Sequence, residues 1–328
     1  MVNVFVDGGS EKLLECYRLM LKIRLFEEKV SDLFEGDKIK SPTHLYIGQE
    51  AVAVGVCAAL DKEDFVYGTH RSHGHYIAKG GSFNALMAEL YGKKTGCSSG
   101  KGGSMHIIAS EVGFMGSSGI VAGTIPIAVG SALAFSLCGG KGVSVVFFGD
   151  GATDGGALYE SLNFAALMKL PVLFVCENNL YSSHLRVNER QALDNIKEKA
   201  QSFGVKSVRV DGNDVVEVYE HAKKFVGEVR LGGGPRFIEA LTFRYRGHVG
   251  PSRDLDKGIR DATEVRAWES KCPIKNLEDF LVGDGVLSKD EVDEIRRSIA
   301  KEIDASVRLA ESCGFPGEDE LYEDVFKK

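Results

Sequence analysis

Several signatures of common protein classes are absent from this chain of 328 residues. Its seven cysteines are scattered, with no CxxC pair and no zinc-like spacing, so neither a disulfide framework nor a structural zinc site is predicted. The first ten residues carry Asp7 and no lysine or arginine, which does not resemble a signal or transit peptide. Free thiols and a cytoplasmic location are therefore expected.

Basic charge and long apolar runs are also scarce. Lysine and arginine number 40 against 47 aspartates and glutamates, and the net charge of −7 argues against a nucleic-acid partner. Residues 112–140 carry no charge, but they include many glycines and serines and Pro126. A membrane span needs about 20 predominantly apolar residues. A buried helix over residues 120–137 is expected instead, with no membrane partner.

The order of the apolar segments predicts an α/β fold. Short apolar runs predict strands at residues 65–67, 143–148, 171–176, 205–210 and 237–243. Helical spacing predicts helices at residues 11–34, 82–91, 158–168 and 215–229. The alternation indicates a doubly wound, mostly parallel sheet.

The chain becomes helical and charged near its C-terminal end. Residues 1–262 are predicted to form an α/β domain with an N-terminal helix, and residues 263–328 a helical extension on that domain, on a partner, or on both. Ser288 and Glu291 fit a capping box, followed by an apolar stripe over residues 292–307. The stripe is expected to cover the main sheet, with a partner-facing helix as the alternative.

Two consecutive predicted strands end in polar residues. Gly149-Asp150-Gly151 follows one and Asn178-Asn179 the next. In open α/β sheets, ligands bind beyond the carboxyl ends of the strands. Carboxylate and amide oxygens are ligands for Mg²⁺ or Ca²⁺, and the glycines allow the backbone to approach a phosphate. The pattern predicts a metal–diphosphate site.

Two other phosphate-binding patterns fail. No GxGxxG opens a helix after a strand, so a nicotinamide-dinucleotide site is not favoured. The segment from Gly96 to Gly102 has too short a spacing for a P-loop. It is expected to be a flexible loop covering the cofactor channel.

Further segments carry a resemblance to a known family. They are HLYIGQEA at residues 44–51, THRSHGH at 69–75, GKGGSMH at 100–106, GIV at 119–121, KLP at 169–171, ENN at 177–179 and RYRGH at 244–248. With the 26 residues that separate GDG from the asparagine pair, they resemble the alpha subunit of the thiamine-diphosphate-dependent 2-oxoacid dehydrogenases, of the pyruvate and acetoin type. The resemblance covers nearly the whole chain.

This resemblance implies a fold, two cofactors and their contacts. The fold is the diphosphate-binding half of the thiamine-diphosphate-binding fold, and the cofactors are thiamine diphosphate and Mg²⁺. The side chains of Asp150 and Asn179 and the backbone carbonyl of Tyr181 are implied to ligate the metal. Other implied cofactor contacts are Arg71, Gly119, Val121, Gly149, Gly151, Ala152 and His248.

The implied reaction is decarboxylation of a 2-oxoacid such as pyruvate, or cleavage of acetoin, with transfer of the acyl unit to a lipoyl acyltransferase. Four histidines are candidate catalytic residues on this basis. His44, His70 and His73 would line the substrate side, and His248 would stand at the mouth of the site. A beta subunit would supply the glutamate that bonds the aminopyrimidine, so an α₂β₂ heterotetramer is implied.

Two departures from the family pattern leave questions open. Asp154 stands where members often have asparagine, and a carboxylate near a diphosphate is unfavourable unless it points away or pairs. Leu180 and the Ser182-Ser183-His184 segment replace a loop that borders the substrate pocket. The substrate, and a contact from His184, therefore stay open. So do a decarboxylase or carboligase outside a lipoyl complex and a non-catalytic cofactor-binding subunit.

Overall fold

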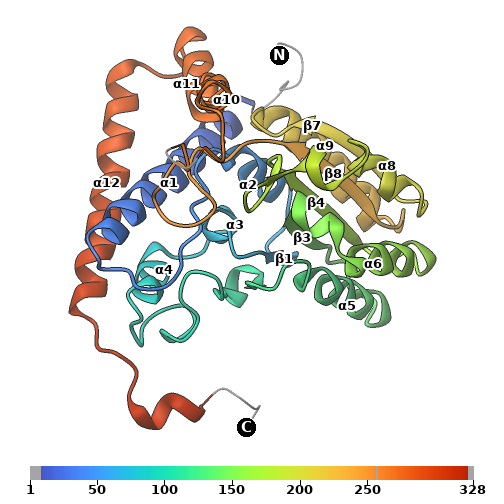
Figure 1. Cartoon of the computed structure of the whole chain (residues 1–328), viewed down its shortest axis with the longest axis horizontal. Coiled ribbons are helices and arrows are strands. Elements are labelled where there is room, and N and C mark those ends of the chain that lie inside the picture. The colour runs from blue at the N-terminus through green and yellow to red at the C-terminus, as the bar shows by residue number, and fades with distance from the viewer. Residues whose placement is uncertain (1–8, 256–257, 324–328) are drawn as a thin grey trace.

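Six strands form the central sheet, in the order β2-β1-β3-β4-β8-β7 (Figure 1). The computed structural model describes residues 9–255 and 258–323, so Asp7 lies outside the described residues. The strands are β1 (Phe65–Gly68), β2 (Phe114–Ser117), β3 (Ser144–Gly149), β4 (Val172–Asn178), β7 (Lys206–Asp211) and β8 (Arg236–Leu241). All five pairings are parallel, which confirms the predicted α/β fold.

Helices cover both faces of this sheet. Successive strand residues point to opposite faces, so Phe147 packs into one core and Phe148 into the other. The first core includes α1 (Gly9–Glu35), α2 (Glu50–Cys57), α3 (His73–Ala78), α4 (Phe83–Leu90) and α9 (Val215–Arg230). The second includes α5 (Thr124–Leu137), α6 (Gly156–Leu167) and α8 (Ile196–Gln201). Burial on both faces explains why β3 and β4 are almost entirely apolar.

Three local features differ from the sequence predictions. The helix expected over residues 120–137 begins at Thr124, and it is not buried on all sides, since the Ile127 side chain is 56% exposed. The histidine-rich segment at residues 69–75, for which no helix was predicted, is helical from His73, where α3 begins. Strand β2 was not predicted, because Gly113 and Gly116 interrupt its apolar pattern. Within the described residues, no helix has the length and apolar character of a membrane span.

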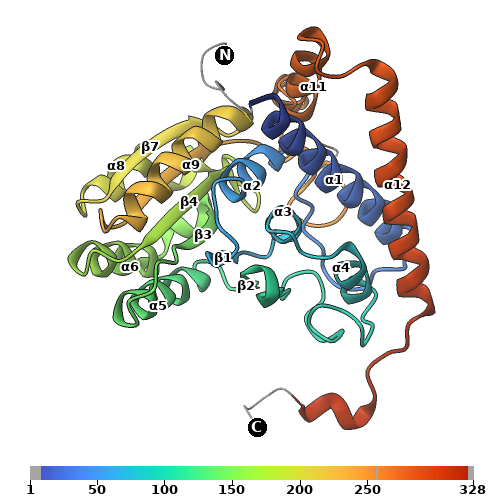
Figure 2. The same cartoon turned by 180° about the vertical axis from the view of Figure 1, so that it is seen from behind.

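The C-terminal helices are α10 (Ala262–Glu269), α11 (Pro273–Gly283) and α12 (Lys289–Ser312). The capping box forms as predicted, because the Glu291 N–H donates to Ser288 Oγ at 3.2 Å and the Ser288 N–H to Glu291 Oε2 at 2.8 Å. The apolar side of α12 does not cover the sheet. It packs on α1 and α4, which separate it from the strands (Figure 2). The division at residue 262 stays a prediction.

Candidate active site

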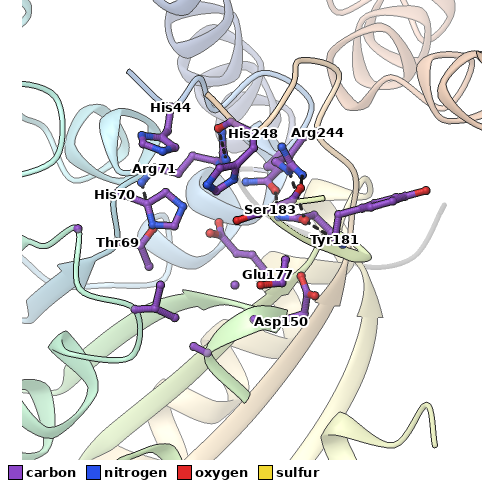
Figure 3. A pocket seen from close by; sticks show the side chains of 18 of the residues that line it. His44, Thr69, His70, Arg71, Asp150, Glu177, Tyr181, Ser183, Arg244 and His248 are labelled. Atoms are coloured by element: carbon purple, nitrogen blue, oxygen red, sulfur yellow. Dashed lines mark hydrogen bonds between the residues drawn. The ribbon is translucent and has the colours of Figure 1, made fainter. Parts of the chain in front are cut away.

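A pocket of about 170 Å³ opens beyond the carboxyl ends of β3 and β4 (Figure 3). Gly149 of β3 pairs with Glu177 of β4, so the polar residues that follow the two strands lie side by side. The pocket is lined by every predicted site residue except one: His44, His70, Arg71, Gly119, Val121, Gly149, Asp150, Gly151, Ala152, Asn179, Tyr181 and His248. Segments far apart in the sequence therefore meet at the predicted edge of the sheet.

The exception is His73, which does not line the pocket. Its side chain is completely buried, and both ring nitrogens are engaged within the protein. Nδ1 lies 3.1 Å from Glu27 Oε2, and Nε2 lies 3.0 Å from Ser104 Oγ. The prediction that His73 faces the substrate is corrected by this placement, because α3 begins at this residue and turns its side chain toward α1.

Asp150 and Asn179 bring oxygen atoms to the floor of the pocket. The Asp150 carboxyl is 1% exposed, and its Oδ1 atom has no hydrogen-bond partner within residues 9–255 and 258–323. The Asn179 amide donates to Gln49 Oε1 at 2.9 Å, which orients its own oxygen. Burial raises the pKa of Asp150 to about 6, against the opposing effect of Arg190 and Arg244. An unpartnered, buried carboxylate oxygen beside an amide oxygen fits a hard divalent cation.

Tyr181 contributes to this wall through its backbone. Its hydroxyl donates to Glu264 Oε2 at 2.8 Å, and Glu264 is not part of the pocket lining. A metal contact from this residue would therefore come from the backbone carbonyl, as the family resemblance implies.

Two buried guanidinium groups make the pocket electropositive. Arg71 donates to the carbonyls of Leu45 at 2.7 Å and His248 at 3.0 Å. Arg244 donates to the carbonyl of Ser183 at 3.2 Å and to Asn179 Oδ1 at 3.4 Å, and its Nη1 atom has no partner in the described part of the chain. Burial and the neighbouring Arg71 lower the pKa of Arg244. Donors without carboxylate partners, facing a pocket, are suited to an anion such as a diphosphate.

Gly151, which follows Asp150, allows its backbone to approach the side chain of Ser182 closely. A Cβ atom placed on Gly151 would lie 2.4 Å from Ser182 Oγ. Left-handed backbone at Ala122, Leu180 and Ser183, with φ of 63°, 72° and 51°, adds local strain around the pocket. Such strain in non-glycine residues persists where the surroundings impose it, and it concentrates at functional sites.

Three imidazoles form a group at the pocket mouth, on the side away from Asp150 in Figure 3. The ring centroids of His44 and His70 are 4.6 Å apart, and those of His44 and His248 are 5.0 Å apart. Burial and Arg71 lower the pKa of His44 to about 2 and the pKa values of His70 and His248 to about 3. The rings are therefore neutral at pH 7.

Two uses of this histidine group can be compared on physical grounds. One ring nitrogen from each lies within 4.8 Å of the others, a spacing that resembles a metal site. The positive charge of Arg71 beside all three rings opposes a cation there. Neutral imidazoles next to a fixed cation are better suited to hydrogen-bond the oxygens of a polar or anionic substrate.

The neutral histidines predict a loss of stability in mild acid. Unfolded histidine titrates near pH 6.5, so below that pH the unfolded chain takes up protons that folded His44 and His70 refuse. The contribution of the two neutral rings to the free energy of unfolding is fully present above pH 6.5. It is lost as the pH falls toward the pKa values of His44 and His70 in the folded chain. Between pH 7.0 and 5.5 we expect each ring to account for about 1 kcal/mol of lost unfolding free energy.

Urea unfolding at the two pH values measures this loss. The variant carrying both His44→Gln and His70→Gln should lose about 2 kcal/mol less than the wild type. His106→Gln, a change of an exposed histidine, is the control for removal of an imidazole. Equal pH dependence in the wild type and the double variant would contradict the prediction.

Several pocket residues were not predicted. Glu177 is buried and accepts hydrogen bonds from the Tyr46 hydroxyl and from His75 Nε2, the latter at 3.0 Å. Gln49, Glu177 and Arg244 all belong to segments that carry the family resemblance, so those segments could have indicated them. Arg190, which contacts Asp150, lies in no such segment, and no sequence signal pointed to it.

The chain resembles known proteins along nearly its whole length. A family model described as "Dehydrogenase E1 component" matches residues 17–318. The alpha subunit of acetoin:2,6-dichlorophenolindophenol oxidoreductase from Bacillus subtilis is 41% identical over 317 residues, which cover 97% of this chain and 94% of the relative. The pyruvate dehydrogenase E1 component subunit alpha of Porphyra purpurea is 39% identical over 328 residues, covering 98% and 94%. Its counterpart from Rhizobium meliloti is 41% identical over 324 residues, covering 98% and 92%.

Proposed function

The chain belongs to the dehydrogenase E1 component family, as a thiamine-dependent oxidoreductase alpha subunit of the pyruvate and acetoin type, and from that premise we propose its reaction. It decarboxylates a 2-oxoacid such as pyruvate, or cleaves acetoin, with thiamine diphosphate and Mg²⁺, and passes the acyl unit to a lipoyl acyltransferase. The observation that carries the proposal is that Asp150 and Arg244, which both line the pocket, each have a buried side-chain atom, Oδ1 and Nη1, without a hydrogen-bond partner among the described residues. The Asp150 carboxylate is suited to bind a cation, and the Arg244 guanidinium is suited to bind an anion.

Different residues of this chain would bind the metal ion and the diphosphate. Asp150, Asn179 and the Tyr181 carbonyl would hold Mg²⁺, and Arg71 and Arg244 would neutralise the diphosphate. Further contacts would come from the backbone of the remaining predicted residues: Gly119, Val121, Gly149, Gly151 and Ala152. When bound, thiamine diphosphate supplies the carbanion that adds to the oxo group and holds the charge left by carbon dioxide.

The histidines would act on the substrate. His44, His70 and His248, uncharged at pH 7, would orient its oxygens by hydrogen bonding at the mouth of the pocket. The His184 ring lies 6.4 Å from that of His248, so a substrate contact from His184 is within the range of a small side-chain movement. Acetoin-type and pyruvate-type relatives have about the same sequence identity to this chain, so identity does not distinguish the two substrates. Activity assays with a panel of 2-oxoacids and acetoin would identify the substrate.

A beta subunit is proposed to complete the site. Val121 lines the pocket and yet is 60% exposed, and the adjacent Ile120 is 73% exposed. Further exposed apolar residues lie on α5 and α6, which pack together: Ile127 is 56% exposed and Leu167 is 76% exposed. Large exposed apolar residues grouped on neighbouring elements indicate an interface. A second chain bound there would cover the pocket mouth, as the α₂β₂ assembly requires.

Charging this surface should prevent assembly. Ile127→Glu would place an unpaired charge within the proposed interface, and we expect the dissociation constant for the beta chain to rise at least about tenfold. Leu309→Glu is the matched control, since Leu309 is 44% exposed on α12, at the opposite side of the molecule (Figure 1). Analytical ultracentrifugation of each variant with the beta chain measures the difference. Assembly of Ile127→Glu with unchanged affinity would remove this surface from the proposal.

Calorimetric titration of thiamine diphosphate with Mg²⁺ tests the function itself. We expect tight binding to the mixture of this chain with its beta chain and weak binding to this chain alone. Equal binding with and without the beta chain would contradict the shared site. Release of free aldehyde from a 2-oxoacid without a lipoyl acceptor would favour a decarboxylase outside a lipoyl complex. Absence of binding to an assembled mixture would favour a non-catalytic subunit.

The location in the cell is a separate proposal. All seven cysteines are free thiols. Thiols of this kind persist in a reducing compartment. This supports the cytoplasmic location expected from the sequence.

A further inference from the structure

Arg190 lies between two carboxylates, that of Asp150, which lines the pocket, and that of Asp154, which does not. It is the last residue of α7 (Val187–Arg190), and its side chain is 9% exposed. Its Nη2 atom contacts Asp150 Oδ2, and its Nη1 atom contacts Asp154 Oδ2. The Nε atom of the same guanidinium is buried, without a partner among the residues that the structure describes. Arg190 therefore occupies Oδ2 of the Asp150 carboxylate. A ligand bound at Oδ1 would share that carboxylate with Arg190.

Asp154 is held independently of Asp150. Gln191 Nε2 donates to Asp154 Oδ1 at 2.9 Å and to Thr153 Oγ1 at 2.6 Å. Lys199 in turn donates to Gln191 Oε1 at 2.8 Å. Asp154 is the carboxylate that departs from the family pattern, and its pairing with Arg190 removes the repulsion that a free carboxylate near a diphosphate would cause.

We propose that Arg190 and Asp154 together set the affinity of Asp150 for its divalent cation. This inference rests on the proposed function. Arg190 competes with the cation for the single negative charge of Asp150, and Asp154 retains the guanidinium when the cation takes Asp150. The partnerless Asp150 Oδ1 is the face open to the cation, and Oδ2 is the face that Arg190 occupies. Arg190 and Asp154 are positioning residues here, because neither would touch the metal.

The competition makes the two single variants act in opposite directions. Arg190→Gln removes the competing charge and should tighten cation binding about tenfold. Asp154→Asn removes the carboxylate that receives the displaced guanidinium, so Arg190 stays on Asp150 and binding should weaken about fivefold. The double variant also lacks the competing guanidinium, so the Asp154 change has nothing to act on, and it should bind as tightly as Arg190→Gln. A merely structural role for Arg190 would not tighten binding.

Mn²⁺ is the probe, measured by electron paramagnetic resonance on the complex with the beta chain, at saturating thiamine diphosphate. Arg190→Lys keeps the charge but contacts one carboxylate at a time, so it should bind Mn²⁺ more tightly than the wild type and less tightly than Arg190→Gln. This second variant keeps the test decisive where Arg190→Gln fails to fold. Mn²⁺ affinity at or below that of the wild type in the folded Arg190 variants would overturn the inference.

Asp150→Asn separates failure of this inference from failure of the proposed function. If Asp150→Asn binds Mn²⁺ as the wild type does, the metal site itself is wrong, and the inference falls with it. If Asp150→Asn loses Mn²⁺ while Arg190→Gln binds it as the wild type does, only the competition is wrong. Loss of Mn²⁺ in the first and tighter binding in the second supports both.

Discussion

Replacing Asp150 with asparagine is expected to abolish cofactor-dependent activity while leaving the fold intact. The change removes one of two carboxylates that line the pocket; the other, Glu177, already accepts hydrogen bonds from Tyr46 and His75. Loss of a group that merely orients a metal ligand reduces affinity by about 10- to 100-fold. Loss of the charged ligand itself should cost at least about a hundredfold in the affinity for Mg²⁺ and thiamine diphosphate, measured by calorimetry on the complex with the beta chain.

The stability of Asp150→Asn should not fall with its activity. Burial raises the pKa of this carboxyl to about 6, so its charge is already disfavoured in the folded chain. Arg190 keeps a contact with Asp154 when Asp150 is replaced. We expect a melting temperature equal to or slightly above that of the wild type. Asp279→Asn, on the exposed side of α11, is the matched control. A variant that binds the cofactor within a factor of about three of the wild type would contradict the assignment.

Replacing Glu89 with alanine is expected to give the largest loss of stability among the changes considered. Glu89 is a completely buried residue of α4. Its Oε1 atom accepts from the N–H groups of Gly102 at 2.8 Å and Gly103 at 2.9 Å. Its Oε2 atom accepts from those of Ser98 at 2.8 Å and Gly100 at 2.9 Å. The glycine-rich loop, expected to be flexible, is thus tied by four backbone bonds to one carboxylate.

Hydrogen bonds to a charged group contribute about 1.5–3 kcal/mol each, but bonds that share one acceptor are not additive. We expect Glu89→Ala to lower the free energy of unfolding by about 3–5 kcal/mol, as for a broken buried polar network. Since Met105 follows this loop and lines the pocket, cofactor binding should weaken as well. Urea unfolding of the full chain at pH 7 measures the first effect.

Two further variants serve as references for the stability loss of Glu89→Ala. Glu89→Gln keeps the shape of the side chain but turns an NH₂ group toward N–H donors, so it should lose an intermediate amount of stability. Glu111→Ala, an exposed glutamate in the same part of the chain, should change stability by less than about 0.5 kcal/mol. A loss below about 1 kcal/mol in Glu89→Ala would show that water replaces the carboxylate at little cost.

The order of the strands and helices, apart from β2 and α3, and the edge at which the site lies are determined by the sequence by itself. Val145 and Phe147 alternate with Val146 and Phe148 in a run that is apolar throughout, which is the local pattern of a strand buried on both faces. Parallel strands end at the same edge, so the position of Asp150 after β3 already implied the neighbourhood of Asn179 after β4. Both conclusions need only residues that are close in the chain.

Only the tertiary structure decided which polar residues face the pocket. His70 lines it and His73 does not, because α3 begins at His73 and turns that side chain toward Glu27, 46 residues earlier in the chain. Arg190 reaches Asp150 across 40 residues, and no local pattern marks it. Side-chain direction at a loop–helix junction, and the pairing of distant charges, follow from the packing of whole elements. The short-range periodicity that predicts the helices and strands indicates neither the side-chain direction nor the charge pairing.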